Sequence, residues 1–299
     1  MTEKQLLYQM DTNFFGTEAV IRRNTLKSNV IQSITSAAFL LAVVGTVIVL
    51  CIGVAADMIT AFHSKELLET DWHLELVTKA AGSEPFMFAL PVLSAVPYTT
   101  SYMDDLKSGY VKEYLPRTTR KQYIFGKAAA CMLSGGAAVI CGMVIFICLV
   151  TIMSVPVELP EHIGDADGLA GGLDNVWTIF AGMPDASVNG TCSDWIGELF
   201  QTAVLAFLAG VFWSFVGMAM ASFTSSRYMA YGGPFIIYYV LIILCERYFP
   251  LCYVLYPKEW LEPSHIPFGV WGVLVIYAEL WCLMMGCFWI RENRRLRML

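Results

Sequence analysis

The chain has 299 residues, of which 57% are hydrophobic and 15% are charged, and its formal net charge is −6. Soluble domains carry roughly 25% charged residues, so this composition excludes a protein made of two soluble domains. No stretch combines basic and aromatic residues in the way that nucleic-acid-binding surfaces do, and we therefore expect no nucleic-acid partner.

The N-terminal residues are not apolar enough to span a membrane. Within residues 4–29, apolar side chains recur at roughly helical spacing among polar ones. This pattern predicts a cytoplasmic amphipathic helix over residues 1–29 that lies on the inner face of the membrane. The alternative is an ordinary frayed N-terminus.

Six apolar runs follow, and each approaches the roughly 20 residues that a spanning helix needs. They cover residues 31–56, 84–103, 127–154, 198–223, 229–249 and 268–290. The second is the weakest because Pro91 and Pro97 interrupt it, although membrane helices tolerate proline where neighbours satisfy the freed carbonyls. The predicted fold is an all-α membrane protein with a six-span domain at residues 30–290 and a basic cytoplasmic tail at 291–299.

The basic residues are divided unevenly between the two sides of these spans. Of the 19 Lys and Arg residues, 15 fall on the side of both termini and four on the other. The loop at residues 155–197 contains no Lys or Arg but has seven acidic residues. The positive-inside rule then predicts that both termini are cytoplasmic and that this loop lies outside.

The segment between the second and third spans, residues 101–127, is long and charged. Asp104 and Asp105 precede Lys107, and a basic run follows from Arg117 to Lys121. Roughly four to six residues suffice to connect two helices, so the extra length suggests a further role. We hypothesise a docking element for a cytoplasmic partner. The alternative is a solvated inner loop whose charge serves topology alone.

Small residues form a stripe along the third span. The stretch Leu133-Ser134-Gly135-Gly136 matches four letters of the LSGGQ signature of ATP-binding-cassette ATPases, but the chain has no Gly-rich phosphate loop. Small side chains recur every four residues at Gly126, Ala130, Ser134, Ala138 and Gly142. Because such faces let membrane helices approach closely, the pattern predicts helix packing rather than an ATP site.

Chemistry outside the membrane is sparse. The four His residues lie in outer loops without metal-ligand spacing, so we expect no metal site and no catalytic residue. Most of the nine cysteines lie in apolar runs, where Cys behaves as a small hydrophobe. Cys192, Cys245 and Cys252 lie on or near the outer side, and their spacing leaves their disulfide state open.

A resemblance adds to this picture. Residues 91–136, PVLSAVPYTTSYMDDLKSGYVKEYLPRTTRKQYIFGKAAACMLSGG, carry a Lys107-Ser108-Gly109 step, the pair Arg120-Lys121 and then Lys127. This stretch resembles the second-to-third-span region of bacterial type-2 permeases of ATP-binding-cassette exporters. VLYPKEWLEP, residues 254–263, is similar to the outer turn that these permeases place between spans five and six.

The resemblance implies a permease subunit that forms the translocation pathway of an exporter in the bacterial cell membrane. A separate ATPase subunit would bind ATP and magnesium, so this chain would need no cofactor, and a second permease, identical or homologous, would complete the pathway. The residues expected to couple to the ATPase are Asp104, Asp105, Lys107, Gly109, Arg117, Arg120 and Lys121. The substrate and the transport direction stay open.

Glu279 is the only carboxylate near the middle of a predicted span. Insertion of an acidic residue at a helix centre costs roughly 2.5–3.5 kcal/mol, so a carboxyl group there is expected to be neutral and hydrogen-bonded. We predict that it faces the pathway; the alternative is a hydrogen bond that only holds helices together. A rival function is an ion- or proton-coupled carrier that uses Glu279, although convincing inverted halves are lacking.

Overall fold

The computed structural model describes residues 28–64, 72–108, 120–154, 192–249, 253–263, 266 and 269–295. Every regular element in these ranges is helical, which confirms the predicted all-α class. The elements are α2 (Ala37–Gly53), α3 (Ala55–Ser64), α4 (Trp72–Ala81), α5 (Glu84–Ala95), α6 (Ser101–Ser108), α8 (Arg120–Ser154), α10 (Cys192–Thr224), α11 (Tyr228–Tyr248), η1 (Tyr253–Leu255) and α12 (Val270–Arg295). The helix predicted at 1–29 lies outside the described residues up to position 27, as does most of the predicted outer loop, residues 155–191.

Four helices are long and apolar enough to cross a membrane. They are Gln122–Ile152 within α8, Leu199–Thr224 within α10, Tyr228–Tyr248, which is α11, and Val270–Arg295, which is α12. Ser28–Ile34 and α2 would together form a fifth span, bent by 52° at the break between them. The chain is therefore an all-α, multi-pass membrane protein, and these helices match the predicted first, third, fourth, fifth and sixth runs.

Hydroxyl side chains explain the bend before α2. Ser33 Oγ donates to the carbonyl oxygen of Val30 at 2.8 Å, within the preceding helical segment. Ser36 caps α2, because its Oγ accepts a hydrogen bond from the backbone N–H of Phe39 at 3.1 Å. Side chains that bond to nearby backbone in this way compete with the helical ladder, so the first apolar run is divided into two helices.

The run predicted as the second span, residues 84–103, is not one helix. α5 ends at Ala95, a turn covers residues 96–100, and α6 begins at Ser101. The 12 residues of α5 rise about 18 Å, which is short of the roughly 30 Å of the hydrocarbon core. Pro91 lies inside α5 and Pro97 follows its end, where its missing N–H cannot continue the ladder.

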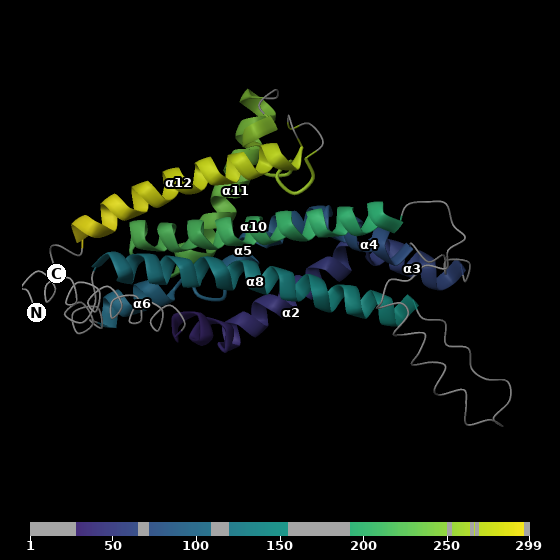
Figure 1. Cartoon of the computed structure of the whole chain (residues 1–299), viewed down its shortest axis with the longest axis horizontal. Coiled ribbons are helices and arrows are strands. Elements are labelled where there is room, and N and C mark those ends of the chain that lie inside the picture. Colours follow the sequence, from purple (N-terminus) through teal and green to yellow (C-terminus); the bar gives the residue numbers. More distant parts are fainter. Residues whose placement is uncertain are drawn as a thin grey trace, which may run out of the picture.

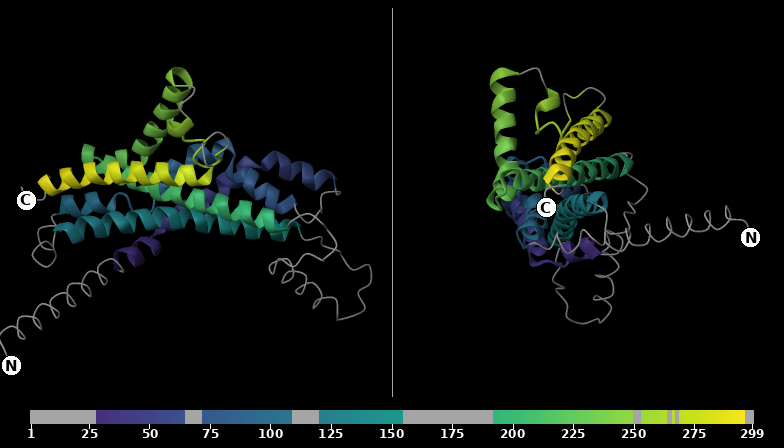
Figure 2. Two further views of the ribbon diagram at one scale, coloured as in Figure 1. Left: turned by 45° about the horizontal axis from the view of Figure 1, so that its top comes forward. Right: turned by 90° about the vertical axis from the view of Figure 1, so that its left-hand side faces the viewer.

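In Figure 1, α8, α10 and α12 run along the long axis of the molecule. α11 leaves this direction at a steep angle in Figure 1 and in Figure 2. α6, the start of α8 and the end of α12 lie at one end, which we call the α6 end. α4 and the start of α10 lie at the opposite end, which we call the α4 end.

Glycine allows α8 and α10 to touch. A Cβ at Gly135 would lie 2.4 Å from Cβ of Ser214 and 2.7 Å from the carbonyl oxygen of Ser94. Ser214 Oγ donates to the carbonyl oxygen of Cys131 at 2.8 Å across this contact. The glycines of the LSGG stretch thus lie at a close contact between α8 and α10, as does Gly210 of α10.

The predicted small-residue stripe of α8 faces the first helix rather than α10. A Cβ at Gly142 would lie 2.6 Å from Cβ of Thr46. Ala138 packs in a small core cluster with Phe39, Ala42 and Val43 of α2. Near the α6 end, the closest atom to a Cβ at Gly126 would be an Asn29 side-chain nitrogen 4.0 Å away.

We expect Gly135→Ala to destabilise the protein by about 1–3 kcal/mol, the usual cost of overpacking a core. The added methyl group would meet the Ser94 carbonyl, which is backbone and cannot rotate aside. Gly232→Ala on α11 is the matched control, because its Cβ would meet nothing within 4 Å. Thermal unfolding in detergent measures the difference, and equal unfolding midpoints for the two variants would contradict this packing.

Between the spans, the structure contains features that the sequence did not predict. α4 is buried through Leu76, Val77, Ala80 and Ala81 and contacts α2, α8 and α10. Trp260, in the turn before α12, is also buried, and its indole N–H donates to the carbonyl oxygen of Val254 at 2.8 Å. Its ring contacts Phe212 of α10 and Tyr277 of α12 edge to face. This turn therefore connects two spans through aromatic packing.

Candidate functional site

The eight-residue helix α6 occupies the α6 end of the bundle, immediately before the predicted coupling segment. Its polar side chains do not point only to water. They join two buried polar clusters, one centred on Lys127 of α8 and the other on Glu292 of α12. We describe these as the Lys127 cluster and the Glu292 cluster.

The Lys127 cluster contains a buried ion pair. Lys127 Nζ lies 2.9 Å from Asp105 Oδ2, and the two side chains are 7% and 19% exposed. Lys127 also donates to Tyr98 Oη and to Ser101 Oγ, each at 3.0 Å. Tyr123 Oη donates to Asp105 Oδ2 at 3.0 Å. All three ammonium protons therefore have an acceptor, which is the condition under which a buried Lys is tolerated.

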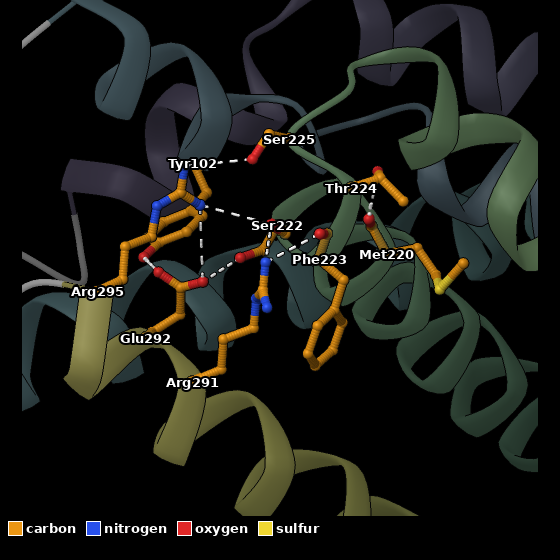
Figure 3. A network of polar contacts seen from close by, with 9 residues as sticks. All are labelled: Tyr102, Met220, Ser222, Phe223, Thr224, Ser225, Arg291, Glu292 and Arg295. Atoms are coloured by element: carbon orange, nitrogen blue, oxygen red, sulfur yellow. Dashed lines mark hydrogen bonds and ion pairs between the residues drawn. The ribbon is translucent and has the colours of Figure 1, made fainter.

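The Glu292 cluster joins three helices around one fully buried carboxylate (Figure 3). Tyr102 of α6 and Ser222 of α10 each donate a hydroxyl hydrogen bond to it. Arg295 Nη1, one turn further along α12, lies 3.9 Å from Glu292 Oε1. Burial, followed by the Glu292 charge, raises the pKa of the Tyr102 phenol far above its usual range. Tyr102 therefore keeps its proton and remains a donor.

Two arginines of α12 form hydrogen bonds with the end of α10 and the turn that follows it. Arg291 Nη2 donates to the carbonyl oxygen of Phe223 at 2.9 Å, and its guanidinium lies over the Phe223 ring at 4.7 Å. Arg295 Nη2 lies within 3.4 Å of Ser225 Oγ, to which it donates, in the turn before α11. The last carbonyls of a helix have no partner within it, so Arg291 satisfies groups that the helix itself leaves open.

A third contact of α6 is of a different kind. Arg227 Nε, just before α11, lies 2.8 Å from Asp104 Oδ1, with the side chains 57% and 45% exposed. This contact has ion-pair distance but lacks hydrogen-bond geometry at the Asp104 oxygen. Exposed pairs of this kind contribute about 0–1 kcal/mol. α6 is thus held firmly by two buried clusters and weakly by one exposed ion pair.

The predicted coupling residues are distributed as follows. Asp104 and Asp105 form the two ion pairs described above, and Lys107 is exposed on α6. Gly109 and Arg117 lie outside the described residues, and so do the side chains of Arg120 and Lys121, whose backbone begins α8.

Sequence reasoning missed the residues that carry the clusters. In the sequence, Lys127 stands out only as part of the stretch that resembles type-2 permeases, and Tyr102 and Ser222 give no signal. Glu292 was hidden because it lies between Arg291 and Arg294, in a stretch that resembles a solvated tail. The available signal was its helical register: α12 continues through Arg295 and includes most of the predicted tail.

Glu279, the predicted pathway residue, lies on an exposed face of α12. Among the described residues, none forms a hydrogen bond or an ion pair with it. In the same part of the chain, no group of three His, Cys, Asp or Glu side chains is placed to hold a metal ion.

An open groove of about 610 Å³ lies at the α4 end. It is lined by Thr78, Lys79, Ala81, Gly82, Gln201, Thr202, Leu261, Glu262 and Pro263. Lys79 Nζ also forms an exposed ion pair with Asp57 Oδ2 at 2.8 Å. Because amide, hydroxyl and charged groups line it, the groove suits polar solutes better than apolar ones.

Comparison of the chain with protein-family models, with curated proteins and with solved structures finds no match. A functional proposal therefore depends on the geometry of the α6 end and on the sequence patterns.

Proposed function

We propose that this chain is the permease subunit of an ATP-binding-cassette exporter and that α6 is the element that couples it to the ATPase. One observation supports the proposal: α6 is bonded through Asp105 to Lys127 of α8 and through Tyr102 to the buried Glu292 of α12, and Glu292 in turn accepts a hydrogen bond from Ser222 of α10. A displacement of α6 would therefore be transmitted to α8, α12 and α10 together. Exposed loop contacts would not transmit force in this way, because they break easily.

The proposed topology has six spans with both termini in the cytoplasm of a bacterial cell. Ser28–Ile34 with α2 forms the first crossing, and α5 with the turn that follows forms the second. α6 then lies on the cytoplasmic side. Basic residues at this end support the orientation through the positive-inside rule: Arg227 forms an ion pair with Asp104 of α6, and Arg291 and Arg294 lie near the end of α12.

In this proposal the ATPase subunit binds ATP and magnesium, and this chain contributes the pathway together with a second permease. The predicted basic run from Arg117 to Lys121, at the junction between the segment after α6 and the start of α8, would supply the docking surface. Closure of the ATPases around ATP would move α6, and the two clusters would pass this movement to α8, α10 and α12. The resemblance of residues 91–136 to type-2 permeases supports this assignment.

Copurification tests the proposal. We expect an ATPase subunit to accompany the chain when it is extracted in mild detergent, and charge reversal to Glu at Arg117, Arg120 and Lys121 to reduce its recovery tenfold or more. Three attractions become repulsions, and about 1.4 kcal/mol corresponds to each factor of ten.

The matched control reverses the charge of Arg247 and of Lys258. Arg247 lies in the last turn of α11, and Lys258 lies in the turn between α11 and α12. This variant should retain the ATPase, and both variants should insert normally into the membrane. Recovery of the chain without any ATPase, combined with transport driven by an ion gradient, would instead identify a secondary carrier.

A further inference from the structure

The groove at the α4 end brings side chains of opposite charge to one opening. Among the residues that line it, Lys79 of α4 supplies a positive charge and Glu262, in the turn before α12, supplies a negative one. Its volume of about 610 Å³ falls within the roughly 300–1,000 Å³ that is usual for small-molecule sites. A solute that matches this lining carries both a cation and an anion.

Three oxygen atoms surround one side of Gly82, the first residue after α4. A Cβ at Gly82 would lie 3.3 Å from Glu262 Oε2, 3.6 Å from the carbonyl oxygen of Thr78 and 3.8 Å from the carbonyl oxygen of Lys79. All four residues line the groove. We call this position, which glycine leaves without a side chain, the Gly82 cradle.

The electrostatics of the Gly82 cradle favour a cation. The last carbonyl oxygens of a helix form the negative end of its dipole, and the Glu262 carboxylate places a full negative charge next to those of α4. Lys79 Nζ pairs with Asp57 Oδ2 at 2.8 Å rather than with this carboxylate. A primary ammonium group has three N–H donors, which matches the three oxygen acceptors. Its nitrogen would lie just beyond the Cβ position, on the groove side.

The other lining residues suit the remainder of such a ligand. Asp57 engages only one face of the Lys79 ammonium group, and the Lys79 side chain is 59% exposed, so a second carboxylate can bind it. Ala81, Leu261 and Pro263 supply apolar surface for a short carbon chain. The groove thus combines an ammonium site, an apolar wall and a carboxylate site.

We propose that this groove binds a small zwitterion of the amino-acid class, with its primary ammonium group in the Gly82 cradle and its carboxylate at Lys79. A simple anion would be repelled by Glu262, and an uncharged solute would engage neither charge. The site does not rest on the transport function, because binding needs neither an ATPase nor an ion gradient. In the proposed topology it opens outside the cell.

A set of three probes tests the charge requirement. The first is ε-aminocaproate, a zwitterion whose flexible chain lets its two charges adopt the spacing of the site. N-acetyl-ε-aminocaproate lacks the ammonium group, and ε-aminocaproamide lacks the carboxylate. Equilibrium dialysis of labelled probes against the full chain in detergent measures binding. We expect each capped probe to bind at least tenfold more weakly than the zwitterion, which corresponds to about 1.4 kcal/mol.

A methyl group placed in the cradle tests the position of the ammonium group. Gly82→Ala should weaken binding of ε-aminocaproate at least tenfold, because its Cβ would stand between the three oxygens and the ligand. The chain should still fold, since the tightest contact is with the end of the flexible Glu262 side chain. Gly197→Ala, also near the start of α10, is the matched control: its Cβ would meet nothing within 4 Å, and binding should be unchanged.

Charge removal assigns each end of the ligand to its residue. Glu262→Gln should weaken binding of ε-aminocaproate at least tenfold but leave the acetylated probe unaffected. Lys79→Gln should weaken binding of the zwitterion but not of ε-aminocaproamide, which has no carboxylate to lose. Both side chains are exposed, and the Lys79–Asp57 pair contributes about 0–1 kcal/mol, so these variants should fold.

Three results would overturn the proposal. They are no binding of ε-aminocaproate to the parent chain, as expected if a group of the chain itself filled the cradle, equal binding of either capped probe, and full binding in Gly82→Ala. The copurification of an ATPase has a separate readout at the opposite end of the molecule. Failure of this site and failure of the transport proposal are therefore distinguishable.

Discussion

Replacing Lys127 by Met is expected to lower the free energy of unfolding by about 3–5 kcal/mol, the range found when a buried ion pair loses one member. Met has a similar length and fills the same space, so the effect is electrostatic. Among the described residues, the variant leaves the largely buried Asp105 carboxylate with only the Tyr123 hydroxyl as a donor. Tyr98 and Ser101 also lose their ammonium partner.

A double-mutant cycle isolates this pair. Asp105→Asn combined with Lys127→Met should cost about 2 kcal/mol less than the sum of the single variants, because neither charge is then left alone. The exposed pair Asp104–Arg227 on the same helix is the control, and its coupling should stay below about 1 kcal/mol. Additive effects at Asp105 and Lys127, measured by denaturation in detergent, would show that the pair does not act as a unit.

Glu292→Leu is the second substitution with a large expected effect, again about 3–5 kcal/mol. It leaves the buried hydroxyl groups of Tyr102 and Ser222 without an acceptor, and each unsatisfied group costs about 1–3 kcal/mol. Arg295 loses its carboxylate as well. Glu292→Gln retains one acceptor oxygen and should cost roughly half as much.

The same substitution in a background that lacks the donors separates hydrogen bonding from packing. In a chain with Tyr102→Phe and Ser222→Ala, Glu292→Leu should cost less than about 1 kcal/mol, since replacing both partners of a hydrogen bond by apolar groups is nearly neutral. Thermal and denaturant unfolding of the parent chain, Glu292→Leu, the Tyr102→Phe and Ser222→Ala background, and the triple variant provide the comparison. An equal cost in both backgrounds would attribute the loss to packing alone.

Four of the six apolar runs fall on helices that are long and apolar enough to cross a membrane, and a fifth does so if Ser28–Ile34 and α2 count as one bent span. They were predictable because a long uncharged run has few structural options in a membrane. The exception is residues 84–103. Whether a helix continues past Pro91 and Pro97 depends on whether neighbouring helices satisfy the freed carbonyl groups, and the sequence does not show these tertiary contacts. α4 was not predicted for a related reason: its ten residues are too few to signal a span. Its helix is held by burial of Leu76 and Val77 against other helices.

Only those residues of the candidate site could be predicted whose charges lie at an unusual place in the sequence. Asp104 and Asp105 stood out because they lie in a long connection between spans. Their partners did not, since Arg227 and Lys127 were indistinguishable from basic residues that set topology. Glu292 was the most difficult, because Arg residues on both sides of it suggest solvent exposure, whereas the register of α12 turns it inward.

The Glu292 cluster also has a consequence for biosynthesis. Tyr102 and Glu292 are 190 residues apart, so at about 5–20 residues per second α6 is made roughly 10–40 s before its acceptor. Until then α6 is held by the Lys127 cluster and by the weak, exposed Asp104–Arg227 ion pair, and the last carbonyls of α10 lack Arg291 as a donor. A nascent chain that stalls before residue 292 has completed most of its spans but displays an unfinished α6 end.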